Sequence, residues 1–279
     1  MTIQSSISAR VISNKPLQKG SACKYFRIAL ALAKPVKKVI PGQFIHIRLD
    51  SKNHILPRPF TIYDISNRGR PARTTVGGGV IEVVYQVIGQ GTEMMSRLKP
   101  GHKVRVLCPL GNGFRIDKKS LMSVLVGGGV GSAGLYLLLK QMMAQQIKNT
   151  YLFLGARSKS DLCLLPEFRR LNPYIVVATE DGSLGTKGLI TASLEKFLNN
   201  SAFPIPHSRM ALYSCGPSGM SQAIRKISMA RRIPAQLSLE ARMACGVGLC
   251  RVCVCKTGKG YSSVCEDGPV FDARELSEA

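Results

Sequence analysis

Cysteines near the C-terminus are the residues of this sequence best suited to chemistry. Four of them lie within the eleven residues from 245 to 255, and a fifth follows ten residues later. In the spacing C-x4-C-x2-C with a more distant fourth cysteine, three thiolates from one tight loop and one from a separate segment hold a plant-type [2Fe–2S] cluster. The spacing therefore predicts an iron–sulfur cluster with the ligands Cys245, Cys250, Cys253 and Cys265.

The residues between the ligands support this prediction. Gly246 and Gly248 let the backbone fold around a small inorganic core with its amides turned toward sulfur. Cys255 lies two residues beyond Cys253, outside the tight loop, and is an alternative ligand. A structural zinc site and buried free thiols are the other interpretations, but zinc sites usually contain two C-x2-C pairs and this sequence has one.

Composition and charge restrict the compartment and the class of partner. The chain has nine cysteines, and its first residues lack the basic and then apolar pattern of a signal peptide, so we expect a cytoplasmic protein that binds metal rather than one built on disulfides. The net charge is +23, but the basic residues are dispersed and form no recognised nucleic-acid motif. We expect a basic surface and no nucleic-acid partner, with a docking face for acidic partners as the alternative.

Three segments with different patterns follow one another along the chain. Residues 1–118 contain short β-branched stretches separated by Gly/Pro turns, which is typical of an antiparallel β-barrel; residues 67–79 are expected to form an exposed hairpin connection. Residues 119–233 alternate strand-like and helix-like stretches, which predicts a doubly wound parallel sheet. Residues 234–279 contain the five C-terminal cysteines and are expected to form a small [2Fe–2S] domain.

One apolar stretch allows a different interpretation. Residues 121–139 carry no charge, and such a stretch is long enough for a membrane helix. Glycines at its centre would weaken that helix. A buried strand, a glycine turn and a buried helix are therefore preferred, and no membrane association is expected.

The glycine turn in this stretch has the form G-x-G-x-x-G, from Gly129 to Gly134, between an expected strand and an expected helix. In that context backbone N–H groups at the start of the helix bind a pyrophosphate. The acidic residue that completes the dinucleotide fingerprint about twenty positions later is absent, so a cluster of packing glycines is the alternative. The residues predicted to bind the nucleotide here are Gly127, Gly128, Gly129 and Gly131.

Two further motifs give the glycine turn a context. Cys215-Gly216-Pro217 follows an expected strand, and Arg58-Pro59-Phe60-Thr61 lies in the predicted barrel. Together with the glycine turn they resemble the motifs of the ferredoxin-reductase superfamily. The resemblance implies that Cys215 lies near a nicotinamide ring, that Arg58 neutralises the pyrophosphate of FAD and that Thr61 bonds the flavin ring. The residues expected to complete the FAD site are Val84, Tyr85, Gln86, Gly91 and Thr92.

Nearly end to end, the chain resembles the electron-transfer subunits of NAD-linked (type B) dihydroorotate dehydrogenases. The resemblance is carried by the three motifs and by residues 238–250, 264–272, 155–161 and 180–183. It implies an oxidoreductase subunit that takes electrons from an FMN-containing, dihydroorotate-oxidising catalytic subunit and passes them through the [2Fe–2S] cluster and FAD to NAD⁺, in pyrimidine biosynthesis. It also implies a heterotetramer of two subunits of each kind, and no catalytic acid or base is expected in this chain.

Three alternatives stay open. The small flavin and iron–sulfur subunit of a sulfide dehydrogenase, or of an electron-bifurcating ferredoxin–NADP reductase, has similar motifs. A zinc-stapled regulatory protein is a non-enzymatic alternative, which a colourless purified chain would favour. Arg157, Ser158 and Lys159 have the chemistry to contact the 2′-phosphate of NADP, whereas the resemblance implies NAD.

Overall fold

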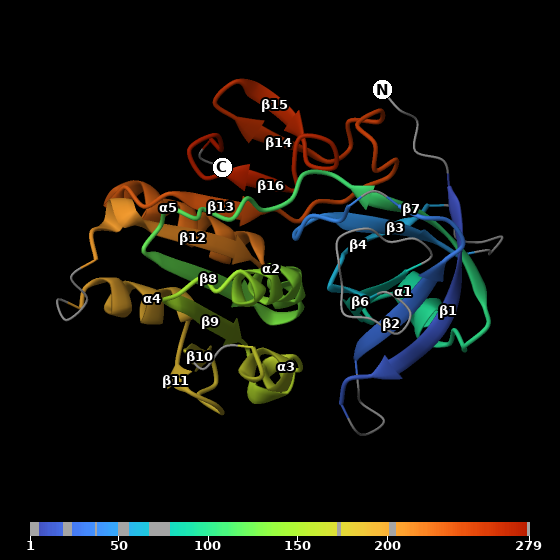
Figure 1. Cartoon of the computed structure of the whole chain (residues 1–279), viewed down its shortest axis with the longest axis horizontal. Coiled ribbons are helices and arrows are strands. Elements are labelled where there is room, and N and C mark those ends of the chain that lie inside the picture. The colour runs from blue at the N-terminus through green and yellow to red at the C-terminus, as the bar shows by residue number, and fades with distance from the viewer. Residues whose placement is uncertain are drawn as a thin grey trace.

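A barrel-shaped antiparallel sheet, a parallel sheet with helices on both faces and a small C-terminal segment make up the protein (Figure 1). This arrangement confirms the predicted fold class. The predicted hairpin connection at 67–79 lies almost wholly outside the described part of the chain. The computed structural model describes residues 6–18, 24–36, 38–49, 56–66, 79–171, 174–200 and 205–277.

The first sheet is a barrel of seven antiparallel strands in the order β4-β3-β7-β1-β2-β6-β5, in which β4 also lies beside β6. Apolar side chains at alternate strand positions fill its interior, and Ile28, Leu30 and Ile81 are fully buried there. Helix α1 (Gln90–Ser96) inserts Met95 into the same core. The strands are β1 (Ile7–Pro16), β2 (Tyr25–Leu32), β3 (Phe44–Arg48), β4 (Arg58–Thr61), β5 (Asp64–Ser66), β6 (Val80–Gln86) and β7 (Lys103–Leu110).

Strand β3 sends its two faces into different cores. Ile45 and Ile47 point into the barrel. Phe44 points outward, into a core that the C-terminal segment shares with the second sheet. His46 points the same way as Phe44, because successive side chains of a strand alternate. One strand therefore joins the barrel to the cysteine-rich segment.

The second sheet has the order β11-β10-β9-β8-β12-β13-β16 and is parallel except for its last pair, β13 and β16. Side chains of β8 alternate between its faces: Val124 and Val126 join the core under α4 and α5, and Leu125 joins the core under α2 and α3. Helices on both faces make the sheet doubly wound. The strands are β8 (Met122–Gly128), β9 (Thr150–Ala156), β10 (Ile175–Thr179), β11 (Thr186–Lys187), β12 (Met210–Cys215), β13 (Ala235–Ser238) and β16 (Val270–Asp272). The helices are η1 (Gly129–Ser132), α2 (Ala133–Ala144), η2 (Lys159–Asp161), α3 (Leu165–Arg169), α4 (Ile190–Leu198), η3 (His207–Arg209) and α5 (Ser218–Arg231).

The uncharged stretch 121–139 forms β8, η1 and part of α2 rather than one continuous helix. Glycines at the centre of the stretch make the turn between strand and helix, as the sequence predicted. Across the described ranges, no helix is both long enough and apolar enough to cross a membrane.

The C-terminal segment is continuous with the second sheet. β13 and β16, both beyond residue 233, are the last two strands of that sheet, and the hairpin of β14 (Val254–Thr257) and β15 (Gly260–Ser263) lies between them in the chain. At the end of the barrel, the Asn112 amide donates to the backbone carbonyl oxygens of Glu266 (3.1 Å) and Asp267 (2.9 Å). The segment is thus fixed both to the sheet and to the barrel.

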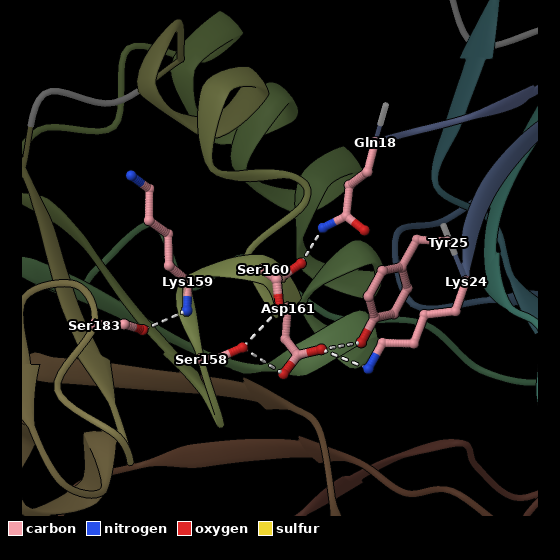
Figure 2. Close-up of polar contacts among 8 residues, drawn as sticks. All are labelled: Gln18, Lys24, Tyr25, Ser158, Lys159, Ser160, Asp161 and Ser183. Atoms are coloured by element: carbon pink, nitrogen blue, oxygen red, sulfur yellow. Dashed lines mark hydrogen bonds and ion pairs between the residues drawn. The ribbon is translucent and has the colours of Figure 1, made fainter. Parts of the chain in front are cut away.

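A polar cluster joins the barrel to the loop that follows β9 (Figure 2). The Asp161 carboxylate accepts a hydrogen bond from the Tyr25 hydroxyl (2.8 Å) and pairs with the Lys24 ammonium (3.0 Å). Gln18 donates its side-chain amide to the backbone carbonyl of Ser160. Burial alone raises the pKa of Asp161, but the hydrogen bonds from Tyr25 and Lys24 outweigh it, so this pKa lies below its ordinary value.

Replacing Asp161 by Asn tests this contact. We expect the free energy of unfolding at pH 7 to fall by about 1–3 kcal/mol, because the buried Tyr25 hydroxyl loses a charged acceptor. Since folding lowers the carboxyl pKa, its stabilising contribution is present above the pKa of an unfolded Asp and is lost as the pH falls through the folded-state value. Denaturant unfolding at neutral and acid pH should therefore show a weaker pH dependence in Asp161→Asn.

Glu180→Gln is the matched control, because Glu180 is an exposed carboxylate in the same domain. It should leave both the stability and its pH dependence unchanged. An Asp161→Asn variant with the full pH dependence of the parent protein would contradict the expected role of this carboxylate.

Candidate functional site

The predicted flavin motif lies on β4, at the edge of the barrel. The Arg58 guanidinium packs so closely on Gly91 that a Cβ atom at position 91 would overlap it. Thr92 holds the same turn together: its hydroxyl donates to the Gly89 carbonyl (2.9 Å) and accepts from the Ile88 amide (3.0 Å). The structure therefore brings Arg58, Gly91 and Thr92 together, as a site for a pyrophosphate requires.

The residues of β6 that were predicted to flank the flavin face in two directions. Tyr85 points into the barrel, where its hydroxyl donates to Asn14 (3.0 Å) and its ring lies 5.8 Å from the Phe60 ring, centroid to centroid. Val84 points instead toward the core of the second sheet, and Gln86 is half-buried at the strand end. The Tyr85 ring thus packs against the Phe60 ring of the flavin motif. Direct contact of Val84, Tyr85 or Gln86 with a flavin stays a prediction.

The flavin motif meets the Cys215 motif across the first turn of α2. A Cβ atom at Gly134 would lie 2.7 Å from the Cys215 sulfur and 3.2 Å from the Thr61 methyl carbon. These three residues come from segments far apart in the sequence. The third glycine of the G-x-G-x-x-G pattern is therefore the position that lets Thr61 and Cys215 approach each other.

The two nucleotide motifs pack backbone to backbone at the carboxyl edge of the parallel sheet. β8 and β12 are neighbours, with Gly127 opposite Cys215. A Cβ atom at Gly131 would lie 2.7 Å from the Gly216 Cα, and one at Gly128 would lie 2.7 Å from Pro217 Cδ. Ligands of open α/β sheets bind at this edge.

Cys215 is a neutral thiol in this environment. Burial raises its pKa to about 12, and the nearby Glu240 carboxylate acts in the same direction, although a hydrogen bond with Ser238 opposes the shift. Burial also raises the pKa of Glu240. Ser238 and Glu240 belong to residues 238–250, which carry part of the family resemblance. Their residue types and spacing did not predict that they lie beside Cys215.

The cysteine loop turns its amides toward sulfur, as predicted. The Val247 and Cys250 amides donate to the Cys245 sulfur (3.5 and 3.4 Å), and the Gly248 amide donates to the Cys265 sulfur (3.2 Å). Gly246 and Gly248 have φ angles of +73° and +80°, which only glycine adopts without strain. Burial alone raises the pKa of the Cys245 thiol, but hydrogen bonds from the Val247 and Cys250 amides and from the Cys250 side chain outweigh it and lower the pKa to about 7.

The four predicted ligands stand as two pairs of thiols. Cys245 contacts Cys250, and Cys253 contacts Cys265. In the described part of the chain, no three His, Cys, Asp or Glu side chains gather closely enough to hold one metal ion. These four thiols would hold a [2Fe–2S] cluster, for which their spacing is typical, whereas a structural zinc site usually has two C-x2-C pairs. Cys255 lies on β14, and the amide-to-sulfur contacts of the loop do not involve it.

The cysteine loop rests on the barrel through His46. A Cβ atom at Gly246 would lie 2.6 Å from Cε1 and 2.7 Å from Nδ1 of this ring. His46 is 1% exposed, and neither ring nitrogen has a hydrogen-bond partner among the described residues. His46 was not among the residues predicted from the sequence; the signal that could have identified it is a polar residue within an otherwise apolar strand.

Two family models match the sequence. The model described as the iron–sulfur cluster binding domain of dihydroorotate dehydrogenase B matches residues 240–277, and the model of an oxidoreductase NAD-binding domain matches residues 125–226.

Curated relatives cover most of the chain. The dihydroorotate dehydrogenase B (NAD(+)) electron transfer subunit of Fusobacterium nucleatum is 38% identical over 243 residues, which cover 85% of this chain and 86% of the relative. The subunit of the same name from Caldanaerobacter subterraneus is 36% identical over 274 residues, which cover 97% of this chain and 98% of the relative.

Solved structures with a similar fold include other flavoprotein reductases. A structure of the NADH-dependent reduced ferredoxin–NADP oxidoreductase, from work on flavin-based electron bifurcation, has a TM-score of 0.77 and 26% identity, covering 96% of this chain and 89% of that chain. A ferredoxin NADP⁺ reductase from Neisseria gonorrhoeae with bound FAD and NADP has a TM-score of 0.64 at 15% identity, covering 81% of this chain and 91% of that chain, and shows likeness of fold alone.

Gly91→Ala should weaken FAD binding, because the added methyl group displaces the Arg58 guanidinium. Loss of a charge-assisted hydrogen bond to phosphate corresponds to roughly 1.5–3 kcal/mol, or about a 10- to 100-fold rise in Kd for FAD. Fluorescence titration of the apoprotein with FAD measures the change. Gly89→Ala is the matched control, since no atom lies within 4 Å of its Cβ position. Equal FAD affinity in the two variants would contradict the predicted role of Arg58 in binding the FAD pyrophosphate.

Replacing any one of Cys245, Cys250, Cys253 or Cys265 by Ser should abolish stable cluster binding, because each thiol belongs to one of the two pairs. Iron and acid-labile sulfide, measured after anaerobic purification, should fall from two of each per chain toward zero. Cys255→Ser should retain both. If a variant of one predicted ligand kept its full iron content and Cys255→Ser lost iron, Cys255 would be a cluster ligand in place of that residue.

Proposed function

Because the chain belongs to the family of dihydroorotate dehydrogenase B electron transfer subunits, we propose that it conducts electrons from a dihydroorotate-oxidising partner to NAD⁺. The observation that carries the proposal is the position of the β3–β4 edge of the barrel. On one side, Thr61 of β4 meets Gly134 and Cys215; on the other, His46 of β3 supports Gly246 of the cysteine loop. The predicted flavin strand thus lies between the nicotinamide motif and the cluster ligands.

This order agrees with the chemistry of the three groups. A nicotinamide exchanges a pair of electrons as hydride, an iron–sulfur cluster exchanges single electrons, and a flavin does both, so FAD belongs between the other two. The residues of this chain bind and orient the groups and exclude water from them. No acid or base of this chain needs to act on the substrate.

Each motif then has a separate task. Arg58, with the turn at Gly91 and Thr92, holds the FAD pyrophosphate, and the Thr61 hydroxyl faces the flavin ring. The glycine turn with Gly216 and Pro217 receives the pyrophosphate and nicotinamide of NAD. The neutral thiol of Cys215 would lie beside the bound nicotinamide and would add no charge there. The four cysteines of the two thiol pairs hold the [2Fe–2S] cluster.

The partner is an FMN-containing catalytic subunit that docks over the cluster. Leu249 is 74% exposed and Val252 is 56% exposed, and both flank Cys250 in the cysteine loop. Exposed apolar side chains beside a redox centre favour a protein contact there, since the contact excludes water and shortens the distance between centres. We further propose a cytoplasmic heterotetramer of two subunits of each kind. We also propose a division of this chain at 118 and 233 into FAD, NAD and cluster domains, in which the cluster domain supplies β13 and β16 to the sheet of the NAD domain.

NAD is the proposed nucleotide. Arg157 and Lys159 are exposed after β9, but Ser158 is engaged: its hydroxyl contacts Ser160 (2.7 Å) and the Asp161 carboxylate (3.2 Å). The Ser158 hydroxyl already has these contacts, and the curated relatives above are named as NAD(+) subunits, which together favour NAD over NADP.

Anaerobic co-purification with the catalytic subunit tests the function. The complex should contain FAD, FMN and iron, and should reduce NAD⁺ with dihydroorotate. In a complex carrying Cys250→Ser, dihydroorotate should no longer reduce NAD⁺, while NADH should still reduce the bound FAD. Undiminished electron transfer from dihydroorotate to NAD⁺ in an iron-free complex would contradict the proposed route.

A subunit of an electron-bifurcating or sulfide-oxidising complex is the second candidate, supported by the 26% identical structure of the NADH-dependent reduced ferredoxin–NADP oxidoreductase. The higher identity of the dihydroorotate dehydrogenase B subunits, 36–38% in the two examples above, favours the first candidate. Reduction of NAD⁺ by the purified complex with dihydroorotate, reduced ferredoxin or sulfide as the sole donor distinguishes the two.

Leu249→Glu tests the proposed docking surface. A carboxylate at the centre of an apolar contact should raise the Kd for the catalytic subunit by about tenfold or more, because a central interface residue contributes roughly 2 kcal/mol. Iron content and NADH-dependent FAD reduction should not change. Leu189→Glu, at a similarly exposed leucine 61% accessible on the second sheet domain, is the control. Equal association of both variants with the partner would place the interface elsewhere.

A further inference from the structure

His46 is a buried polar residue that the proposed electron route does not use. It lies on the outward face of β3, and its exposed fraction is 1%. Both ring nitrogens lack a hydrogen-bond partner among the described residues. Because a neutral imidazole always has one N–H donor, leaving that donor buried without an acceptor is unfavourable. The ring therefore points to an acceptor that is not a side chain or backbone atom of these residues.

The neighbours of the ring on its own sheet supply no acceptor. Pro59 of β4 and Leu107 of β7 lie opposite His46 across the sheet, and the Phe44 ring packs edge-on at 5.6 Å. None of these three side chains can accept a conventional hydrogen bond. The edge of the imidazole that carries both nitrogens and Cε1 faces Gly246 of the cysteine loop, with all three atoms within 3.1 Å of the Cβ position.

The cysteine loop is rich in sulfur acceptors. Backbone amides of Val247, Gly248, Cys250 and Cys265 already donate to cysteine sulfurs there. Gly246 has no side chain, so no Cβ atom separates the imidazole from the backbone of the cysteine loop. The imidazole that lacks an acceptor therefore packs directly against the loop whose amides point at cysteine sulfurs.

We propose that His46 donates its ring N–H to a sulfur of the [2Fe–2S] cluster and thereby raises the reduction potential of that cluster. The inference rests on the proposed cluster, and it assigns His46 a positioning and tuning role. Reduction adds negative charge to the sulfurs, so a hydrogen bond to one of them stabilises the reduced cluster more than the oxidised one. Because His46 shares its strand pair with the flavin motif, the bond also fixes the cluster relative to β4.

Two substitutions separate hydrogen bonding from packing. His46→Leu fills the space without a donor, whereas His46→Gln keeps an N–H donor of similar reach. In the anaerobically purified holoprotein, a redox titration followed by electron paramagnetic resonance measures the midpoint potential of the cluster. We expect this potential to fall in His46→Leu and to return toward the parent value in His46→Gln. The potential of FAD, titrated in the visible spectrum, should not change.

A second measurement detects the bond directly and needs no variant that disturbs folding. The chain has four histidines, so ¹⁵N-histidine labelling introduces few signals. Pulsed electron paramagnetic resonance of the reduced cluster should show coupling to a histidine ¹⁵N, and this coupling should disappear in His46→Gln.

Three results have distinct meanings. Equal cluster potentials in both variants and no ¹⁵N coupling, with full iron content, would overturn the inference while leaving the proposed function intact. A shift of the FAD potential alone would overturn it in favour of the flavin as acceptor. Absence of iron from the parent protein would reject the proposed function itself.

Discussion

The rest of the structure depends on one constraint: at several glycines a neighbouring segment packs so closely that a Cβ atom would overlap it. Gly134 lets Cys215 approach Thr61, Gly91 seats Arg58, Gly131 packs on Gly216, and Gly246 receives His46. Each contact joins segments far apart in the chain. Electron and hydride transfer both need centres close together, and a methyl group at any of these positions would push two segments apart. The glycines therefore set the distances between the proposed cofactor sites.

The packing of β3 explains why these contacts do not separate. Its inward residues belong to the barrel core, and Phe44 belongs to the core that contains Cys253, Cys265 and the strands β12 and β13. A strand buried on both faces cannot shift its register by one residue without exchanging the two sets of side chains. The barrel and the cysteine-rich segment are thus parts of one packed body, and strands β13 and β16 continue the second sheet into that segment.

Local patterns in the sequence predicted the fold class, the alternation of strands and helices in residues 119–233, the glycine turn and the inward-turned amides of the cysteine loop. These features depend on spacing within about a dozen residues, where periodicity and turn chemistry are informative. Long-range neighbours were not predictable. His46 and Glu240 gain their surroundings only when distant segments fold together, and the same holds for Asp161, which is engaged with Lys24 and Tyr25. Contact of the predicted site residues with FAD, NAD and the [2Fe–2S] cluster stays a prediction, because the spacing of residues in the sequence does not fix where these cofactors lie.

The contact of Lys24 and Tyr25 with Asp161 has a consequence for nucleotide exchange. The loop after β9 is held by the barrel, which is a different structural unit from the sheet that carries the loop. Its shape is set before a nucleotide arrives, so little conformational entropy is lost when one binds. In the proposed function this preorganisation strengthens the binding of NAD, because it lowers the entropic cost of binding.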